Sequence, residues 1–340
     1  MKKLFGNKYK FYLIAMGLLG AQFGFAEKTK ASDDWQLPVK CKIGDNCFLQ
    51  NLVDMDTSQK VHDTLCQGAT YDGHKGIDIR VKTTEVMDRG VTVVAAADGV
   101  VLGTRDGMDD VLVKGRELPE AIKGRECGNG LAIRHSGGLV SQYCHMKRGT
   151  VAFKKGDRVK QGEAVGQIGL SGHTQFPHLH FTVRREGEVI DPLSGKVPRS
   201  DFCPSDLSFQ DSFFSQPVTD ALIQSRNVIF DVGLSGEIPD LDQMVFGKKP
   251  KVASVDLPIT IGWVWVINLE KGDTIRSVIR TQDGAVFSQS QSEPQDRHKA
   301  QYFHYSGKKR PATPGTYTMD VSIIRDGSIV RSRSQEFKIN

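Results

Sequence analysis

Apolar and polar positions alternate in short segments, separated by glycine-containing turns, from residue 71 to about residue 198. The apolar segment 91–97 is followed by an Asp-Gly turn and more apolar residues, which predicts a strand, a turn and a strand. Residues 130–135 and 139–145 flank a Ser-Gly-Gly turn and predict a hairpin. Further strands are predicted over residues 159–168 and 178–184.

A second group of short strands with hairpin turns and little helix occupies residues 207–340. Apolar side chains alternate with polar ones at 317–323, and an Asp-Gly turn leads from there into the last apolar segment. This pattern predicts an immunoglobulin-like β-sandwich, with an unrelated small barrel as the alternative. We therefore expect a mainly β protein whose two domains meet near residues 199–206.

Residues 1–26 have the pattern of a secretory signal peptide. A basic stretch precedes the uncharged run Phe11–Phe25, and the small residues Gly24 and Ala26 fit the cleavage rule. A membrane anchor is the alternative, but the run is shorter than the ~20 residues that span a bilayer. We predict cleavage after Ala26 and a periplasmic or secreted mature protein.

The net charge of +5 comes mostly from this first segment, which holds four lysines and no acidic residue. The remaining 41 basic and 40 acidic residues nearly balance, since 45 less 4 is 41. A nucleic-acid-binding protein usually keeps a basic excess. We therefore expect no nucleic-acid partner.

Six cysteines lie beyond the predicted signal peptide, and an even number in an exported chain predicts disulfides. A Cys-rich zinc site is the alternative, although the sequence contains no C-x-x-C pair. Cys41 and Cys47 are the favoured local pair, and the other pairings stay open. We expect Cys144 to join a bridge on the face of its strand opposite His145. The remaining cysteines are Cys66, Cys127 and Cys203.

Histidines and one aspartate form a chemically informative pattern. His74 and Asp78 stand four residues apart at the start of a predicted strand, and His178 and His180 flank Leu179 on another. Residues i and i+2 of a strand face the same side, so His178 and His180 should enter one cavity. Two histidines and a carboxylate suit a zinc ion with an open fourth position.

His145 lies on a third predicted strand, in the string Tyr143-Cys144-His145. Regular alternation predicts that Tyr143 and His145 share one face. The three segments together are a stronger signal than any single histidine, because each offers groups of compatible chemistry.

Several ordered motifs carry a family resemblance: HKGIDIR, AAADGVV, YCH, SGHTQFPHLHF and a closing IDP. Over residues 70–193 the chain resembles the LytM/lysostaphin-type metallopeptidases, the M23 peptidase family. The resemblance implies a small β-sheet catalytic domain, which we place at residues 69–200. Residues 27–68 are polar and weakly patterned, which predicts a loop-rich segment before it. It also implies peptidoglycan peptides as the usual substrate.

Carried over by position, the resemblance implies that His74, Asp78 and His180 bind Zn²⁺. It implies that His145 and His178 act beside the metal as proton-transfer or oxyanion-stabilising groups, without deciding which does which.

We therefore expect an exported zinc endopeptidase that hydrolyses peptidoglycan cross-links or stem peptides. The alternatives are a non-catalytic LytM-like protein that binds peptidoglycan or activates an amidase, and a secreted protease acting on proteins. The C-terminal domain would supply a protein-partner or cell-wall contact.

Overall fold

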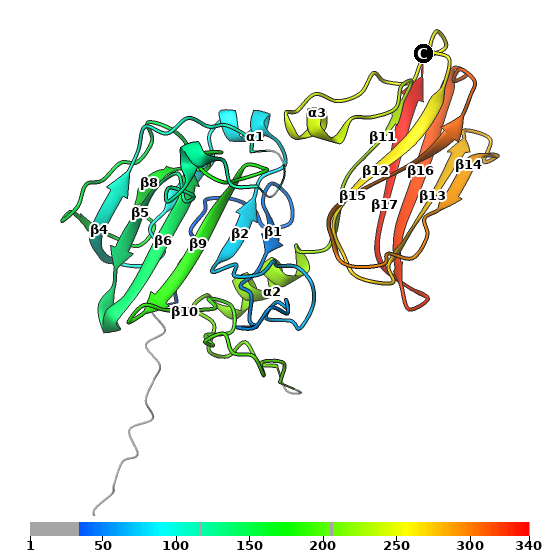
Figure 1. Ribbon diagram of the computed structural model, residues 1–340. Helices are drawn as coiled ribbons and strands as arrows, with labels where there is room; N and C mark the ends of the chain where they lie inside the picture. The colour runs from blue at the N-terminus through cyan, green and yellow to red at the C-terminus, as the bar shows by residue number, and fades with distance from the viewer. Residues whose placement is uncertain (1–33, 114, 116, 205–206, 340) are drawn as a thin grey trace, which may run out of the picture. The chain divides into compact units, whose positions relative to one another are not determined.

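The computed structural model describes residues 34–113, 115, 117–204 and 207–339 (Figure 1). The predicted signal peptide, residues 1–26, lies outside the described residues. The described chain is mainly β, as expected. The domain limits predicted above stay predictions.

The largest sheet in the described part of the chain has eight strands, and β6, β9, β2 and β1 lie side by side in it (Figure 1). The predicted hairpin of β5 and β6 is confirmed, since these strands pair antiparallel. β1 pairs with β2, so the predicted loop-rich segment 27–68 contributes a strand to the sheet. The order is β1 (Phe48–Asn51), β2 (Ile77–Arg80), β9 (His178–Arg185), β6 (Leu139–Met146), β5 (Asn129–Arg134), β4 (Gly99–Arg105) and β7 (Arg158–Val159), with β10 (Glu188–Ile190) beside β9.

The predicted strand-turn-strand around the Asp-Gly turn gives two strands in different sheets. β3 (Thr92–Val94) pairs with β8 (Ala164–Gln167), whereas β4 pairs with β5 and β7. The backbone beyond β3 continues toward the same partner segment, because Ala95 donates to the Glu163 carbonyl. The two predicted strands are thus present, but each pairs with strands far along the chain and not with the other.

One apolar core lies against the large sheet. Leu179, Phe181 and Ile79 are fully buried in it, and Leu222 of helix α2 packs into the same cluster. Burying such a side chain contributes about 1.5–3 kcal/mol, so the alternation of apolar and polar residues determines which face of each strand meets the core.

The helices are α1 (Thr84–Asp88), η1 (Glu120–Ile122), η2 (Ser136–Gly138), α2 (Gln216–Gln224) and α3 (Leu241–Val245).

The C-terminal strands form a three-stranded and a four-stranded sheet in the described residues. Val264 from the first and Ile279 and Met319 from the second belong to one buried apolar cluster. The immunoglobulin-like assignment stays a prediction. The sheets are β11 (Val228–Ser235), β12 (Thr260–Leu269), β15 (Lys299–Lys308), and β14 (Val286–Gln291), β13 (Thr274–Thr281), β16 (Gly315–Arg325), β17 (Ser328–Ile339).

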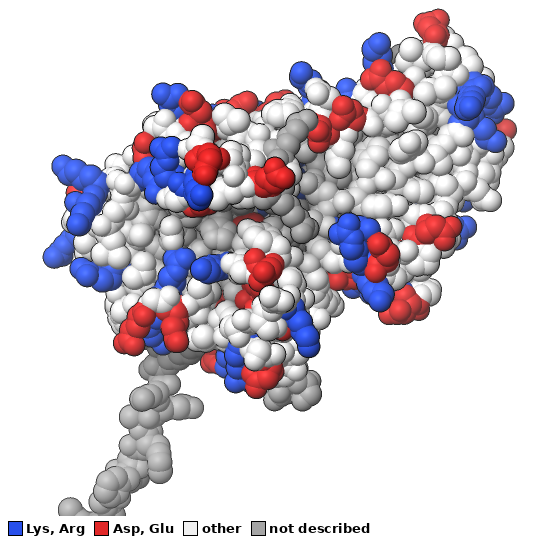
Figure 2. Space-filling view, viewed as in Figure 1, with Lys and Arg blue, Asp and Glu red and all other residues white. Residues whose placement is uncertain are grey.

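Basic and acidic side chains are interspersed over the face of the molecule shown in Figure 2. None of the helices within the described ranges has the length and apolar character needed to cross a membrane.

The six cysteines, all within the described residues, form three disulfides. The predicted Cys41–Cys47 bridge is present. Cys144 takes part in a bridge, as expected, and its partner is Cys127. The third bridge, Cys66–Cys203, joins residues 137 positions apart in the sequence.

We expect peptide mapping of the non-reduced mature protein to recover these three linked pairs. In the folded chain, the two cysteines of each pair are joined by a disulfide bond. A reduced digest is the control. Six free thiols, or a different set of pairs, would contradict the disulfide assignment.

Candidate metal-binding active site

The structure brings together three side chains with metal-ligand chemistry. Asp78 on β2 lies directly opposite His180 on β9, and His74 precedes β2. Asp78 Oδ1 lies 2.8 Å from His180 Nδ1 and 3.2 Å from His74 Nε2, and the two ring nitrogens are 3.1 Å apart. One such atom from each residue lies within 4.8 Å of the others. These three residues could hold one metal ion.

Gly76 allows this approach. A Cβ at this position would lie 2.5 Å from the Phe181 carbonyl oxygen and 2.9 Å from the His180 ring. Any larger residue would therefore push β2 away from β9 at the point where Asp78 meets His180.

Neighbouring groups orient the three side chains. The Leu52 carbonyl accepts a hydrogen bond from His74 Nδ1 at 2.6 Å, which leaves Nε2 directed toward Asp78. Asn51 Nδ2 donates to Asp78 Oδ2 at 2.7 Å, and Thr182 Oγ1 lies 2.9 Å from His180 Nε2. Such partners fix the tautomer and orientation of a ligand.

Burial and mutual charge set the ionisation of this group. Burial alone would raise the pKa of Asp78, but His74 and His178 outweigh it and hold that pKa well below its usual range. Burial lowers the pKa of His180. At His74, in contrast, burial is outweighed by the charge and the hydrogen bond of Asp78, which raise the pKa. The site therefore presents an ionised carboxylate that attracts a cation, and a metal ion bound there would displace the proton that Asp78 favours on His74.

His145 and His178 lie beside the three residues, with their ring centroids 4.7 Å apart. His145 Nδ1 donates to the Ser171 carbonyl, and His178 Nδ1 donates to the Phe176 carbonyl, both at 2.8 Å. In a neutral ring Nε2 then carries the lone pair, and in His178 this atom lies 3.5 Å from Asp78 Oδ1. Burial, followed by the nearby His178 and His180, holds the pKa of His145 well below its usual value.

The predicted placement of Tyr143 on the same face as His145 is wrong. Tyr143 lies opposite Phe181, with ring centroids 5.2 Å apart, and both belong to the apolar core. Cys144 lies opposite His180, on what we call the histidine face, the side of the sheet that carries Asp78, His178 and His180. The expectation that Cys144 braces the strand from the opposite side is wrong for the same reason.

A β-bulge explains the difference. The pairing of β5 with β6 shifts between Asn129 and Leu131, so Cys144 and His145 together lie opposite Gly130. His145 has a φ of 61°, in the left-handed region. A bulge of this kind turns two successive side chains to one side of the sheet.

Several residues that orient the three side chains belong to no sequence motif named above. Thr182 could have been found, because it lies two residues after His180 and therefore faces the same side. Asn51 and Leu52 belong to a segment with no recognisable motif, and only the pairing of β1 with β2 brings them to Asp78 and His74.

A His-Asp-His group whose aspartate and second histidine face each other on paired β-strands, accompanied by two further histidines, is typical of a metallohydrolase. Residues 72–192 match the model of peptidase family M23, which identifies this part of the chain as an M23 peptidase domain. The resemblance inferred from the motifs is thereby confirmed.

Relatives were found among characterised proteins. The chain is 29% identical over 140 residues to the DD-carboxypeptidase/endopeptidase Mpg of Neisseria meningitidis, a match over 40% of this chain and 26% of that protein. It is 37% identical over 73 residues to the peptidoglycan DD-endopeptidase ShyC of Vibrio cholerae, over 22% and 16% of the two chains. The chain thus spans about a quarter or less of the length of these curated relatives.

Among solved structures, a zinc-containing peptidase from Vibrio cholerae is 24% identical, with a TM-score of 0.26 over 43% of this chain and 39% of that chain.

We expect Asn51→Ala to weaken divalent-metal affinity about 10–100-fold, the usual effect of removing a group that orients a ligand. The substitution removes the donor to Asp78 Oδ2 but none of the three grouped side chains. Competition with a chromophoric chelator measures the affinity. Asn46→Ala, an exposed asparagine of the same segment, is the control, and equal affinities in the two variants would contradict the role of Asn51.

Proposed function

We propose that this chain is an exported zinc endopeptidase that hydrolyses peptide bonds in peptidoglycan cross-links or stem peptides. The observation that carries the proposal is the convergence of His74, Asp78 and His180 within 4.8 Å, beside His145 and His178. The match to family M23 and the peptidoglycan endopeptidases among the relatives support the reaction class and the substrate.

The donor set fits zinc. Two imidazole nitrogens and one carboxylate oxygen are ligands that zinc takes in hydrolytic enzymes, where three protein ligands leave a position for water or substrate. His74, Asp78 and His180 would hold the ion. When bound, zinc supplies Lewis-acid activation for the attack of water on a carbonyl carbon.

His145 and His178 would handle the protons. Their Nδ1–H groups donate to the Ser171 and Phe176 carbonyls, so in a neutral ring Nε2 is the unprotonated nitrogen. A neutral imidazole accepts the proton of the attacking water, and an imidazolium donates to the oxyanion or to the leaving amine. The two rings, with centroids 4.7 Å apart, are close enough to divide these roles.

Hydrolysis is favoured over a binding-only role because all five positions are occupied by chemically competent residues. An amidase-activating protein would need none of them. We further propose periplasmic or secreted localisation, since the six cysteines are all paired, and disulfides persist in oxidising compartments. The C-terminal strands would provide a contact to the wall or to a protein partner.

Digestion of purified peptidoglycan by the mature chain tests the proposal. We expect mass spectrometry to detect new peptide ends, about one zinc per molecule, loss of hydrolysis on chelation and recovery with added zinc. Denatured casein is the parallel substrate for the protease alternative. Full hydrolysis by a rigorously metal-free sample would overturn the zinc mechanism.

Paired variants separate metal binding from proton transfer. His180→Ala removes a ligand, so zinc content and cleavage rate should fall together. His145→Ala should keep zinc and lose about 10²–10⁴-fold in turnover, the usual contribution of general acid–base catalysis. Metal content and cleavage rate, both measured on folded protein, distinguish a metal ligand from a proton-transfer residue.

His304→Ala is the control for this pair, because His304 lies on β15 and bonds to Ser290. It should retain both zinc and activity. Loss of zinc in His145→Ala would make His145 a ligand, and an undiminished rate would remove it from the mechanism.

A further inference from the structure

Cys144 and His145 are neighbours on the histidine face because of the bulge in β6. Gly130, opposite them, has no room for a side chain: a Cβ there would lie 1.9 Å from the Tyr143 carbonyl oxygen. The close approach of β5 to β6 thus depends on Gly130. This approach places the backbone of β5 against the residues that precede His145.

His145 is held through its backbone as well as through its ring. Its N–H donates to the Cys127 carbonyl at 2.8 Å, and its own carbonyl accepts from the Gly169 N–H at 3.0 Å. Its Nδ1 donates to the Ser171 carbonyl at 2.8 Å. Two segments, around Cys127 and around 169–171, therefore determine where Nε2 points.

These two segments are packed directly on each other. A Cβ at Gly128 would lie 2.4 Å from the Ser171 carbonyl oxygen, and one at Gly172 would lie 2.2 Å from the Glu126 carbonyl oxygen. The Asn129 N–H donates to Ser171 Oγ at 2.9 Å. A displacement of the Cys127 segment would therefore also displace the carbonyl that accepts from the His145 ring.

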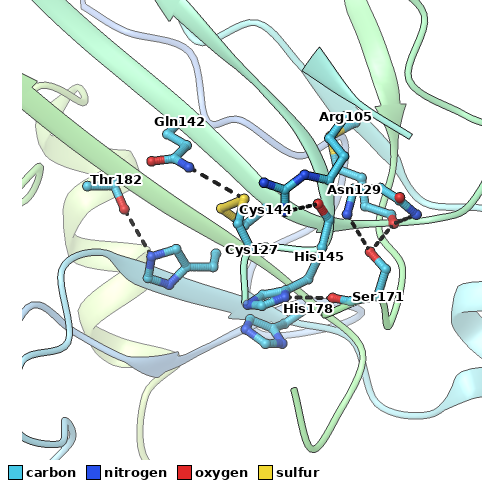
Figure 3. The surroundings of a disulfide bond; sticks show 12 residues. Arg105, Cys127, Asn129, Gln142, Cys144, His145, Ser171, His178 and Thr182 are labelled. Atoms are coloured by element: carbon cyan, nitrogen blue, oxygen red, sulfur yellow. Dashed lines mark hydrogen bonds between the residues drawn. A yellow bond between two sulfur atoms is a disulfide. The ribbon is translucent and has the colours of Figure 1, made fainter. Parts of the chain in front are cut away.

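The Cys127–Cys144 disulfide ties this segment to the residue that precedes His145 (Figure 3). Gln142 Nε2 donates to Cys127 Sγ at 3.4 Å, and Arg105 donates to the Gly128 carbonyl at 3.4 Å. Figure 3 shows the sulfur pair beside the His145 and His178 rings. The covalent bond is thus part of the support of His145.

We propose that the Cys127–Cys144 disulfide positions His145, so that full hydrolytic activity requires this bond to be formed. The inference rests on the proposed function of the site. On formation, the two thiols lose two protons and two electrons to a disulfide-bearing oxidant, which is reduced to a dithiol. Activity is thereby confined to oxidising compartments, where such a bond persists.

The test compares two disulfide-free variants of the full mature chain. Cys127→Ala/Cys144→Ala should keep its zinc and an almost unchanged KM, while kcat falls about 10²-fold, the scale of a 1 Å misplacement of a reacting group. The His145 ring signal in the proton NMR spectrum, assigned by comparison with His145→Gln, should shift. Cys41→Ala/Cys47→Ala should keep the parental kcat and the parental signal.

A parental kcat in Cys127→Ala/Cys144→Ala, or an equal loss in both variants, would overturn the proposal. If the alanine pair does not fold, Cys127→Ser/Cys144→Ser keeps the side-chain volume and takes its place. If the parent chain itself hydrolyses no peptidoglycan, the proposed function fails separately. The NMR comparison then decides the positioning role, and an unchanged His145 signal would refute it.

Discussion

The site depends on the antiparallel register between β2 and β9, which places Asp78 directly opposite His180. Because the side-chain period of a strand is two, a slip by one residue would turn either group into the apolar core. Leu179 and Phe181 oppose such a slip, since both are fully buried on the other face. The same burial that stabilises the sheet therefore holds the candidate ligands together.

A carboxylate and several histidines concentrated in a buried space would be costly without mutual support. Asp78 is ionised because His74 and His178 compensate its burial, and Asn51 bonds its second oxygen. Strand β1 thus has two effects: it extends the sheet and brings Asn51 to the carboxylate. A peptidase domain lacking this segment would lack an orienting group at its centre.

The bulge in β6 adds a second constraint. It removes His145 from the alternation that directs Tyr143 into the core, and it places Cys144 beside His145 on the histidine face. The chemistry of the site therefore comes from regular pairing at β2 and β9 and from irregular pairing at β6. Disulfide, glycine and carbonyl contacts hold the irregular strand in place.

Sequence patterns alone predicted the mainly β class, the hairpin of β5 and β6, the Cys41–Cys47 bridge and the shared face of His178 and His180. Each depends on spacing within a few residues, where strand periodicity and turn chemistry act locally. The folded chain was needed to identify the partner of Cys144, the pairing of β3 with β8 and the approach of Asn51 to Asp78. The same holds for the face of His145, because a bulge depends on how the facing strand packs, and Gly130 gives no sign of this in the linear pattern. These features join residues far apart in the chain, so their energies belong to contacts that no local pattern encodes.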